Sequence, residues 1–200
     1  MTDYFALLDE PRRPWLDPQA LKTKFLKLAA ETHPDKKPGA GEMEKAAANR
    51  DYAELNAAFI CLAEPKLRLL HLLELELGTK PPEVQQIPSA LGNLFAEVAM
   101  TCENADAFLA VKNKTASPLL QVRLFEQAQA LDGQLRALQT RLAGLQGKLI
   151  EELKSLDASW TSSAGERPVW LNRLEELYRL FGYFNRWNGQ IQERIVQLSL

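Results

Sequence analysis

The 200-residue sequence has few of the residues that form disulfide frameworks or metal centres, and it lacks the long apolar run of a membrane span. Its two cysteines and two histidines are too few and too widely spaced for a four-ligand metal site. We expect Cys61 and Cys102 to be free thiols buried in helices. No stretch approaches the ~20 apolar residues that cross a bilayer, and the start MTDYFALLDEP lacks the basic and apolar regions of a secretory signal. We therefore expect no metal, no cofactor, no membrane partner and a cytoplasmic location.

The sequence also lacks a strong charge of either sign and any familiar catalytic motif. The net charge is −2, from 24 basic and 26 acidic residues, whereas a general nucleic-acid binder is usually visibly basic. No dinucleotide-binding glycine motif, P-loop, nucleophile elbow or zinc-protease motif is present. Adjacent carboxylates such as Glu151 and Glu152 do not face each other on a helix. The sequence therefore predicts neither an enzyme nor a nucleic-acid-binding protein.

Alternation of apolar and polar residues with a period of two is absent, so we expect an all-α fold with little or no sheet. Prolines divide the first part of the chain. A short helix ends at Pro11, and Asp17 before Pro18 is a typical helix start. That second helix stops before His33-Pro34, because proline disfavours helical geometry in the preceding residue. The Gly/Pro-rich residues 36–46 are predicted to be a loop.

Two more helices complete this half. The first is a long helix with an apolar stripe of Tyr52, Leu55, Phe59 and Leu62. The second covers residues 66–77 and is opened by Pro65. Gly78, Pro81 and Pro82 then interrupt the helical pattern. We place a domain boundary there, which gives domains of residues 1–78 and 83–200.

The second domain contains three amphipathic segments, near residues 89–109, 119–156 and 170–198. The middle segment repeats leucine at steps of three and four residues, as in the heptad pattern of a coiled coil. The first segment has a stripe of Leu91, Phe95, Val98, Cys102 and Ala105. Short loops join the segments, so we expect an antiparallel three-helix bundle in a monomer. The heptad seam also leaves a dimer open.

Basic residues concentrate at one place. Lys22, Lys24 and Lys27 lie on the polar side of the second helix, and Lys36 and Lys37 follow it. Positions 22–37 contain these five cations and only two acidic residues. Such a local positive face beside an apolar one predicts a docking surface for an acidic partner, although a merely solvated helix face would look the same.

His33-Pro34-Asp35 lies between this basic helix and the predicted loop. The arrangement resembles the J domain over residues 3 to about 65. The similarity includes a short first helix at residues 3–8 and a third helix containing Leu55-Asn56-Ala57-Ala58-Phe59. It implies a protein that docks on a DnaK/HscA-type chaperone and stimulates its ATP hydrolysis.

The resemblance also implies roles for individual residues. Asp35 would bond to an arginine of the chaperone, Pro34 would fix the turn, and His33 would position it. Lys22, Lys24 and Lys27 would form the basic docking face. Leu26 departs from the family, in which a second cation is common at that position.

Within J-domain proteins the chain resembles the HscB family of iron–sulfur cluster assembly co-chaperones. It has no Gly/Phe-rich linker and no CxxCxGxG repeats. Pro65, Arg68, Leu72 and Leu73 match the pattern that joins the two HscB domains. Leu72 and Leu73, with Leu69, are predicted to bury against the bundle.

The HscB resemblance implies the scaffold protein IscU as client. The client surface would correspond here to Leu94, Phe95, Glu97 and Val98. Of these, Glu97 keeps the family's character, while the rest of residues 91–98 differ from it. Two alternatives therefore stay open: a divergent J-domain protein with another client, and a structural coiled-coil protein with an inert J-like segment.

Overall fold

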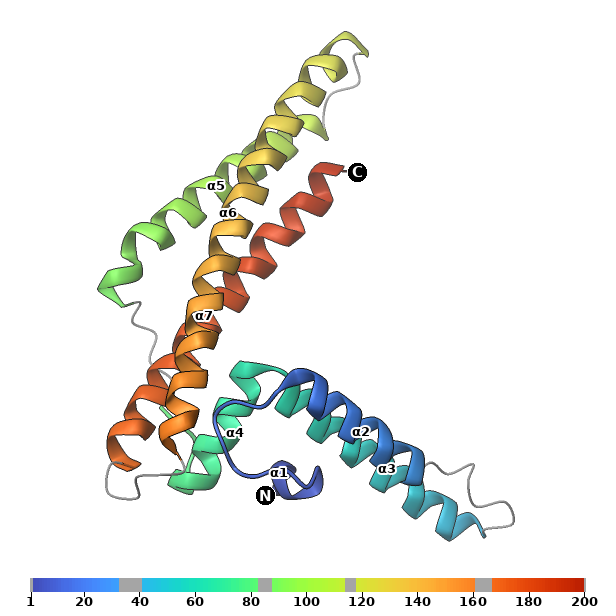
Figure 1. The fold of residues 1–200 in the computed structure, drawn as a ribbon. Helices are drawn as coiled ribbons and strands as arrows, with labels where there is room; N and C mark the ends of the chain where they lie inside the picture. The colour runs from blue at the N-terminus through green and yellow to red at the C-terminus, as the bar shows by residue number, and fades with distance from the viewer. Residues whose placement is uncertain (1, 33–40, 83–87, 114–117, 161–166, 200) are drawn as a thin grey trace. The chain divides into compact units, whose positions relative to one another are not determined.

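The computed structural model describes residues 2–32, 41–82, 88–113, 118–160 and 167–199. Within these ranges every regular element is a helix, which confirms the predicted all-α class (Figure 1). The elements, in chain order, are α1 (Tyr4–Leu7), α2 (Pro18–Thr32), α3 (Glu42–Ala63), α4 (Pro65–Leu77), a 3-10 turn η2 (Ser89–Leu91), α5 (Gly92–Lys112), α6 (Pro118–Trp160) and α7 (Arg167–Ser199).

Local capping explains where several helices begin and end. Asp17 accepts a hydrogen bond from the Ala20 amide at 2.8 Å, directly before Pro18. Glu64 caps α4 by accepting from the Leu67 amide at 2.7 Å. Gly78 ends α4 with a left-handed φ of 72°, which glycine adopts without steric cost. These boundaries agree with the sequence prediction.

Two boundaries differ from the prediction. Helix α3 already begins at Glu42, inside the expected loop, and its first turn contains Glu42 and Glu44. Carboxylates in a first turn are stabilised by the positive end of the helix dipole. Helix α6 continues to Trp160, beyond the expected end at Leu156. The Trp160 indole is buried and donates a hydrogen bond to another segment, so the last turn of α6 has a tertiary anchor.

The chain forms two compact units. Unit 1 consists of Met1–Pro82 with Glu151–Arg179, and unit 2 consists of Glu83–Ile150 with Leu180–Leu200. Helices α6 and α7 therefore contribute residues to both. The division of the chain into domains 1–78 and 83–200 stays a prediction about its functional modules.

In unit 1, α2 and α3 lie side by side as a helical hairpin (Figure 1). Between them the rings of Phe25 and Phe59 stack with centroids 4.3 Å apart. Leu69, Leu72 and Leu73 of α4 are fully buried, and that they bury against the bundle stays a prediction. The same unit contains further buried leucines from α6 and α7, namely Leu153, Leu174 and Leu177.

In unit 2, α5 and parts of α6 and α7 enclose one hydrophobic core. The heptad seam of α6 is buried in it rather than exposed, as expected for packing within one chain. The expected stripe of α5 needs a correction at one position. Leu94 is in the core, whereas Phe95 is 44% exposed. The core residues are Leu94, Val98, Cys102, Ala105, Leu109, Ala128, Leu135, Leu138, Leu142, Phe184, Trp187, Ile191, Ile195 and Leu198.

His71 of α4 is buried and holds α1 in place. Its Nε2 accepts a hydrogen bond from the Tyr4 amide at 3.0 Å, and its ring lies 4.7 Å from that of Tyr4. Burial lowers the pKa of His71, and Arg12 adds to this, while Asp3 and Glu74 oppose it. The imidazole is therefore neutral in the folded protein, because protonation would remove the acceptor.

This arrangement predicts a pH-dependent stability. Because the folded pKa of His71 lies below its unfolded value of 6.5, the unfolded state binds more protons at mildly acidic pH. The free energy of unfolding should fall as pH decreases below about 6.5, by at most about 1.4 kcal/mol per pH unit from this group. Urea denaturation at several pH values should show this slope reduced in His71→Phe. An equal slope in both proteins would contradict the assignment.

Candidate chaperone-docking surface

The three lysines predicted to form the docking face on α2 have two different environments. Lys22 and Lys27 are exposed, and neither has an ion-pair partner among the residues that the structure describes. The Lys24 ammonium instead donates to the Asp9 carbonyl at 2.6 Å and to Glu10 Oε1 at 2.9 Å. Lys22 and Lys27 therefore present free charge, whereas Lys24 joins α2 to the preceding connection.

The surface beside these lysines contains apolar as well as charged groups. Leu26, the departure from the J-domain pattern, is 54% exposed next to Lys27. A groove of about 590 Å³ runs along α2 and its N-terminal connection. It is lined by Asp9, Asp17, Gln19, Ala20, Thr23, Lys24, Lys27, Leu28 and Glu31. The face thus combines unpaired cations with accessible apolar area, which suits a protein partner of opposite charge.

His33, Pro34 and Asp35, together with Lys36 and Lys37, lie outside the described residues. The structure does place the end of α2 directly before them, at Thr32. The Thr32 hydroxyl donates to the Leu28 carbonyl at 2.9 Å within the last turn. The His33-Pro34-Asp35 tripeptide therefore follows immediately, along the chain, the helix that carries Lys22 and Lys27.

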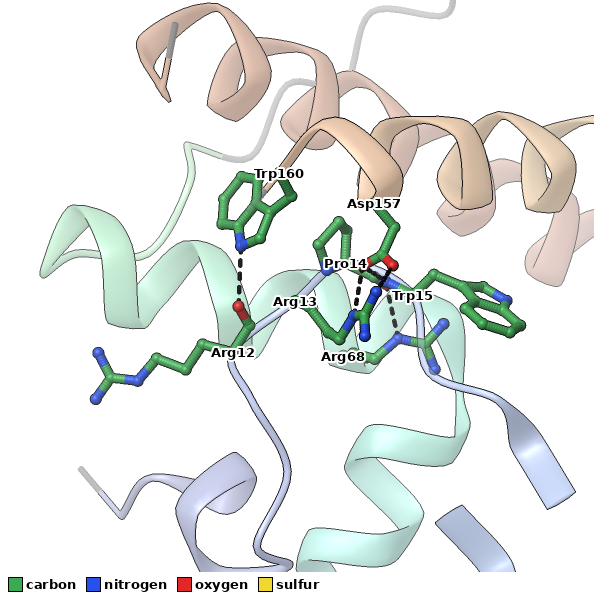
Figure 2. Close-up of polar contacts among 7 residues, drawn as sticks. All are labelled: Arg12, Arg13, Pro14, Trp15, Arg68, Asp157 and Trp160. Atoms are coloured by element: carbon green, nitrogen blue, oxygen red, sulfur yellow. Dashed lines mark hydrogen bonds and ion pairs between the residues drawn. The ribbon is translucent and has the colours of Figure 1, made fainter. Parts of the chain in front are cut away.

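Residues 12–15, in the connection between α1 and α2, are bound from the end of α6 (Figure 2). The Asp157 carboxylate accepts from Arg13 Nε at 2.9 Å, from a second nitrogen of the same guanidinium, and from the Trp15 amide at 3.3 Å. This carboxylate raises the pKa of Arg13. Trp160 Nε1 donates to the Arg12 carbonyl at 2.9 Å.

The same connection is bound from α4 by Arg68, part of the pattern that resembles the HscB junction. Arg68 is 3% exposed, and its Nε donates to the Pro14 carbonyl at 2.9 Å (Figure 2). Nη1 donates to the Leu62 carbonyl at 2.5 Å. Burial lowers the pKa of Arg68 to about 10, with nearby Glu64 and Asp157 acting in the opposite direction. Arg68 is thus a buried, hydrogen-bonded cation that organises unit 1.

The sequence pattern identified Arg68 but did not identify the residues bound to the same segment, which are described above. Asp157 follows the last leucine of the α6 seam and looks like an ordinary solvated carboxylate. Arg13 and Trp15 lie between helices, in a stretch without periodicity. No local signal connects residues that are 144 positions apart.

Of the four residues predicted to bind a client, two lie in the core and two lie on the surface. Leu94 and Val98 belong to the core of unit 2, so they do not present a surface to a partner. Phe95 is exposed, with its ring centroid 6.4 Å from that of Trp187. Glu97 accepts from Arg141 Nη1 at 2.6 Å. The structure thus narrows the candidate client surface to Phe95 and Glu97.

The cysteines and the other potential metal ligands among the described residues are not grouped. In the described part of the chain, no three His, Cys, Asp or Glu residues are grouped to hold a metal ion. None of the described helices is both long and apolar enough to span a bilayer. Cys102 is buried as expected, while Cys61 is half-buried and donates to the Leu67 carbonyl. Burial raises the pKa of Cys61 to about 11, with Glu74 and Glu64 contributing, so its thiol stays protonated at neutral pH.

The described residues thus form a helical hairpin with a basic face on α2 and a helical core built from α5, α6 and α7. No family model matches the chain. Among solved structures, the chain is similar to chaperone HscB from Vibrio cholerae, with a TM-score of 0.61 and 20% identity over 98% of this chain and 99% of the other. It is also similar to the human co-chaperone protein HscB, with a TM-score of 0.60 and 18% identity over 96% of this chain and 81% of the other. The chain therefore has the HscB fold along nearly its whole length, as the sequence resemblance predicted.

The contacts of Asp157 predict a specific stability loss. Asp157→Ala leaves the Arg13 guanidinium and the Trp15 amide without their acceptor. We expect a loss of about 1–3 kcal/mol. This is below the cost for a fully buried pair, because the Arg13 side chain is 35% exposed and can regain water. Chemical denaturation of the full chain measures the change.

Glu151→Ala is the matched control, because Glu151 is an exposed carboxylate on the same helix and pairs only with Lys154 in the described contacts. It should change stability by less than about 0.5 kcal/mol. Equal effects of the two substitutions would show that Asp157 has no special role.

Proposed function

We propose that this protein is a J-type co-chaperone that stimulates ATP hydrolysis by a DnaK/HscA-type chaperone and delivers a protein client to it. One observation carries the proposal. In a chain with the HscB fold, Lys22 and Lys27, which have no ion-pair partner among the described residues, lie on the helix that precedes His33-Pro34-Asp35 in the sequence. The fold, the basic face and the tripeptide are three features that occur together in this class.

The chemistry assigns separate roles to these groups. Lys22 and Lys27 attract an acidic surface of the chaperone and align the two proteins. Asp35 then forms a charge-assisted hydrogen bond with an arginine of the chaperone. Pro34 restricts the backbone and so reduces the entropy lost on binding. Lys24 instead connects α2 to the preceding segment, because its ammonium is bound to Asp9 and Glu10.

The second part of the proposal concerns the client. An iron–sulfur scaffold of the IscU type is the client that the HscB resemblance indicates, and Phe95 with Glu97 is its candidate contact. A different client is the alternative. Most of residues 91–98, which surround Phe95 in the sequence, differ from the pattern of the HscB family. The structural coiled-coil alternative is less well supported, since the α6 seam is covered by the chain's own helices.

The first functional test is single-turnover ATP hydrolysis by a DnaK/HscA-type chaperone from the same cell. The full chain should accelerate hydrolysis, and Asp35→Asn should abolish the effect. The double variant Lys22→Glu/Lys27→Glu should need at least about tenfold more protein for half-maximal stimulation, which corresponds to about 1.4 kcal/mol. The stimulation should also weaken as salt shortens the screening length to below ~10 Å.

Lys148→Glu is the control for charge reversal, because Lys148 is an exposed lysine of α6 that belongs to unit 2. It should leave stimulation unchanged. If neither the native chain nor any variant accelerates hydrolysis by any DnaK-type chaperone of the cell, the co-chaperone proposal is wrong.

The client proposal has its own test, which is binding of a purified IscU-type scaffold to the full chain. Phe95→Ala should weaken binding about tenfold, since exposed aromatic anchors are common hot spots. Met100→Ala is the matched control, because Met100 is 59% exposed on the same helix. Absence of scaffold binding, with ATPase stimulation intact, would favour a different client.

A further inference from the structure

In the α2–α3 hairpin, the rings of Phe25 and Phe59 face each other with their centroids 4.3 Å apart. Successive residues of an α-helix are rotated about its axis by about 100°. Because the two helices of a hairpin run antiparallel, the residue that follows each ring turns toward the same side. Leu26 and Ile60 therefore share one side of the hairpin, and the residues that precede the two rings share the opposite side.

The chain itself covers that opposite side. Lys24, which precedes the first ring, binds through its ammonium to Asp9 and Glu10 in the segment after α1. Ala58, which precedes the second ring, is fully buried. Helix α1 also packs on α3. Helix α1 and the segment after it thus lie on the side away from the residues that follow the rings.

The side with Leu26 and Ile60 is exposed and largely apolar. Leu26 is 54% exposed, and Ile60 is 62% exposed. Helical steps of three or four residues place four neighbours on this side, namely Lys22 and Ala30 of α2 and Ala53 and Asn56 of α3. None of these four is acidic. Exposed aliphatic side chains grouped in this way are typical of an interaction site, and we call them the Leu26–Ile60 patch.

Lys22 connects this patch to the candidate docking surface. It lies four residues before Leu26, on the same side of α2, and it has no ion-pair partner among the described residues. A partner whose carboxylate meets Lys22 therefore also covers Leu26. Protein interfaces commonly have this arrangement, with apolar contacts at the centre and charged groups at the rim.

We propose that the Leu26–Ile60 patch binds an apolar area of the DnaK/HscA-type chaperone, next to the acidic group that meets Lys22. This inference rests on the proposed function and names a determinant of which chaperone is recognised. A chaperone with an ionised side chain opposite the patch would lose the hydration of that charge without gaining a partner. The patch therefore selects a chaperone that is apolar at this point.

The patch and the lysines respond differently to salt. Attraction between exposed charges weakens as the screening length falls from ~30 Å to ~10 Å, between roughly 0.01 M and 0.1 M salt. Burial of apolar area does not depend on this screening. The patch therefore supplies a part of the affinity for the chaperone that remains at the higher salt concentration.

The test is single-turnover ATP hydrolysis by the DnaK/HscA-type chaperone, titrated with the full chain at both salt concentrations. The double variant Leu26→Ala/Ile60→Ala should need about tenfold more protein for half-maximal stimulation at either salt concentration, with the maximal rate unchanged. The loss in Lys22→Glu/Lys27→Glu should instead shrink at the higher salt concentration. This difference separates an apolar contact from a general weakening of the surface.

Leu77→Ala/Val169→Ala is the matched control. Leu77 is 44% exposed and Val169 is 66% exposed, and both belong to unit 1 but lie outside the hairpin. This variant should leave the concentration for half-maximal stimulation unchanged. Because the side chains of the patch are exposed, circular dichroism should show the same unfolding temperature for Leu26→Ala/Ile60→Ala and the native chain.

The outcomes separate this proposal from the co-chaperone proposal. If the native chain and Leu26→Ala/Ile60→Ala stimulate hydrolysis at the same concentration, the patch proposal is wrong and the co-chaperone proposal stands. If the native chain stimulates no DnaK-type chaperone of the cell, both proposals fail. A dimer in sedimentation that the double variant dissociates would also overturn the patch proposal, because a second copy would then cover the patch.

Discussion

Unit 1 depends on the buried carboxylate of Asp157. The chain between α1 and α2 is not helical around residues 12–15, so its backbone groups need partners from elsewhere. Asp157 accepts from the Trp15 amide and the Arg13 guanidinium, and Arg68 donates to the Pro14 carbonyl. One short connection is thereby held by the end of α6 and by α4. The opposite charges also offset part of the cost of removing these groups from water.

This cluster is linked to the proposed docking face through Lys24. Its ammonium is bound to Asp9 and Glu10, a few residues before the segment that Asp157 and Arg68 hold. The helix that carries Lys22 and Lys27 therefore contacts both α3 and the segment between α1 and α2. A rigid support of this kind reduces the entropy lost when the docking surface binds a partner. The arrangement gives the three lysines different tasks, although they look equivalent in the sequence.

Much of the fold follows from short-range chemistry. Asp17 with Pro18, Glu64 with Pro65, and Gly78 mark helix ends through hydrogen bonds and backbone preferences that involve only near neighbours. The heptad spacing on α6 likewise predicted a bundle. The predicted apolar stripe of α5 was wrong at one position, where two neighbouring apolar residues could each face the core. Both Leu94 and Phe95 fit an apolar stripe, and only the packed core shows that Leu94 is inside.

The sequence by itself determined the all-α class, most helix ends, the resemblance to J-domain proteins and the place of the basic helix. These depend on periodicity, capping and a contiguous motif, which are encoded within a few residues. Only the tertiary structure decided that Asp157 is buried against Arg13. It also decided that Lys24 is bound to Asp9 and Glu10, while Lys22 and Lys27 have no ion-pair partner among the described residues. Each of these depends on which distant segments meet and in what register, and local sequence preferences do not specify that.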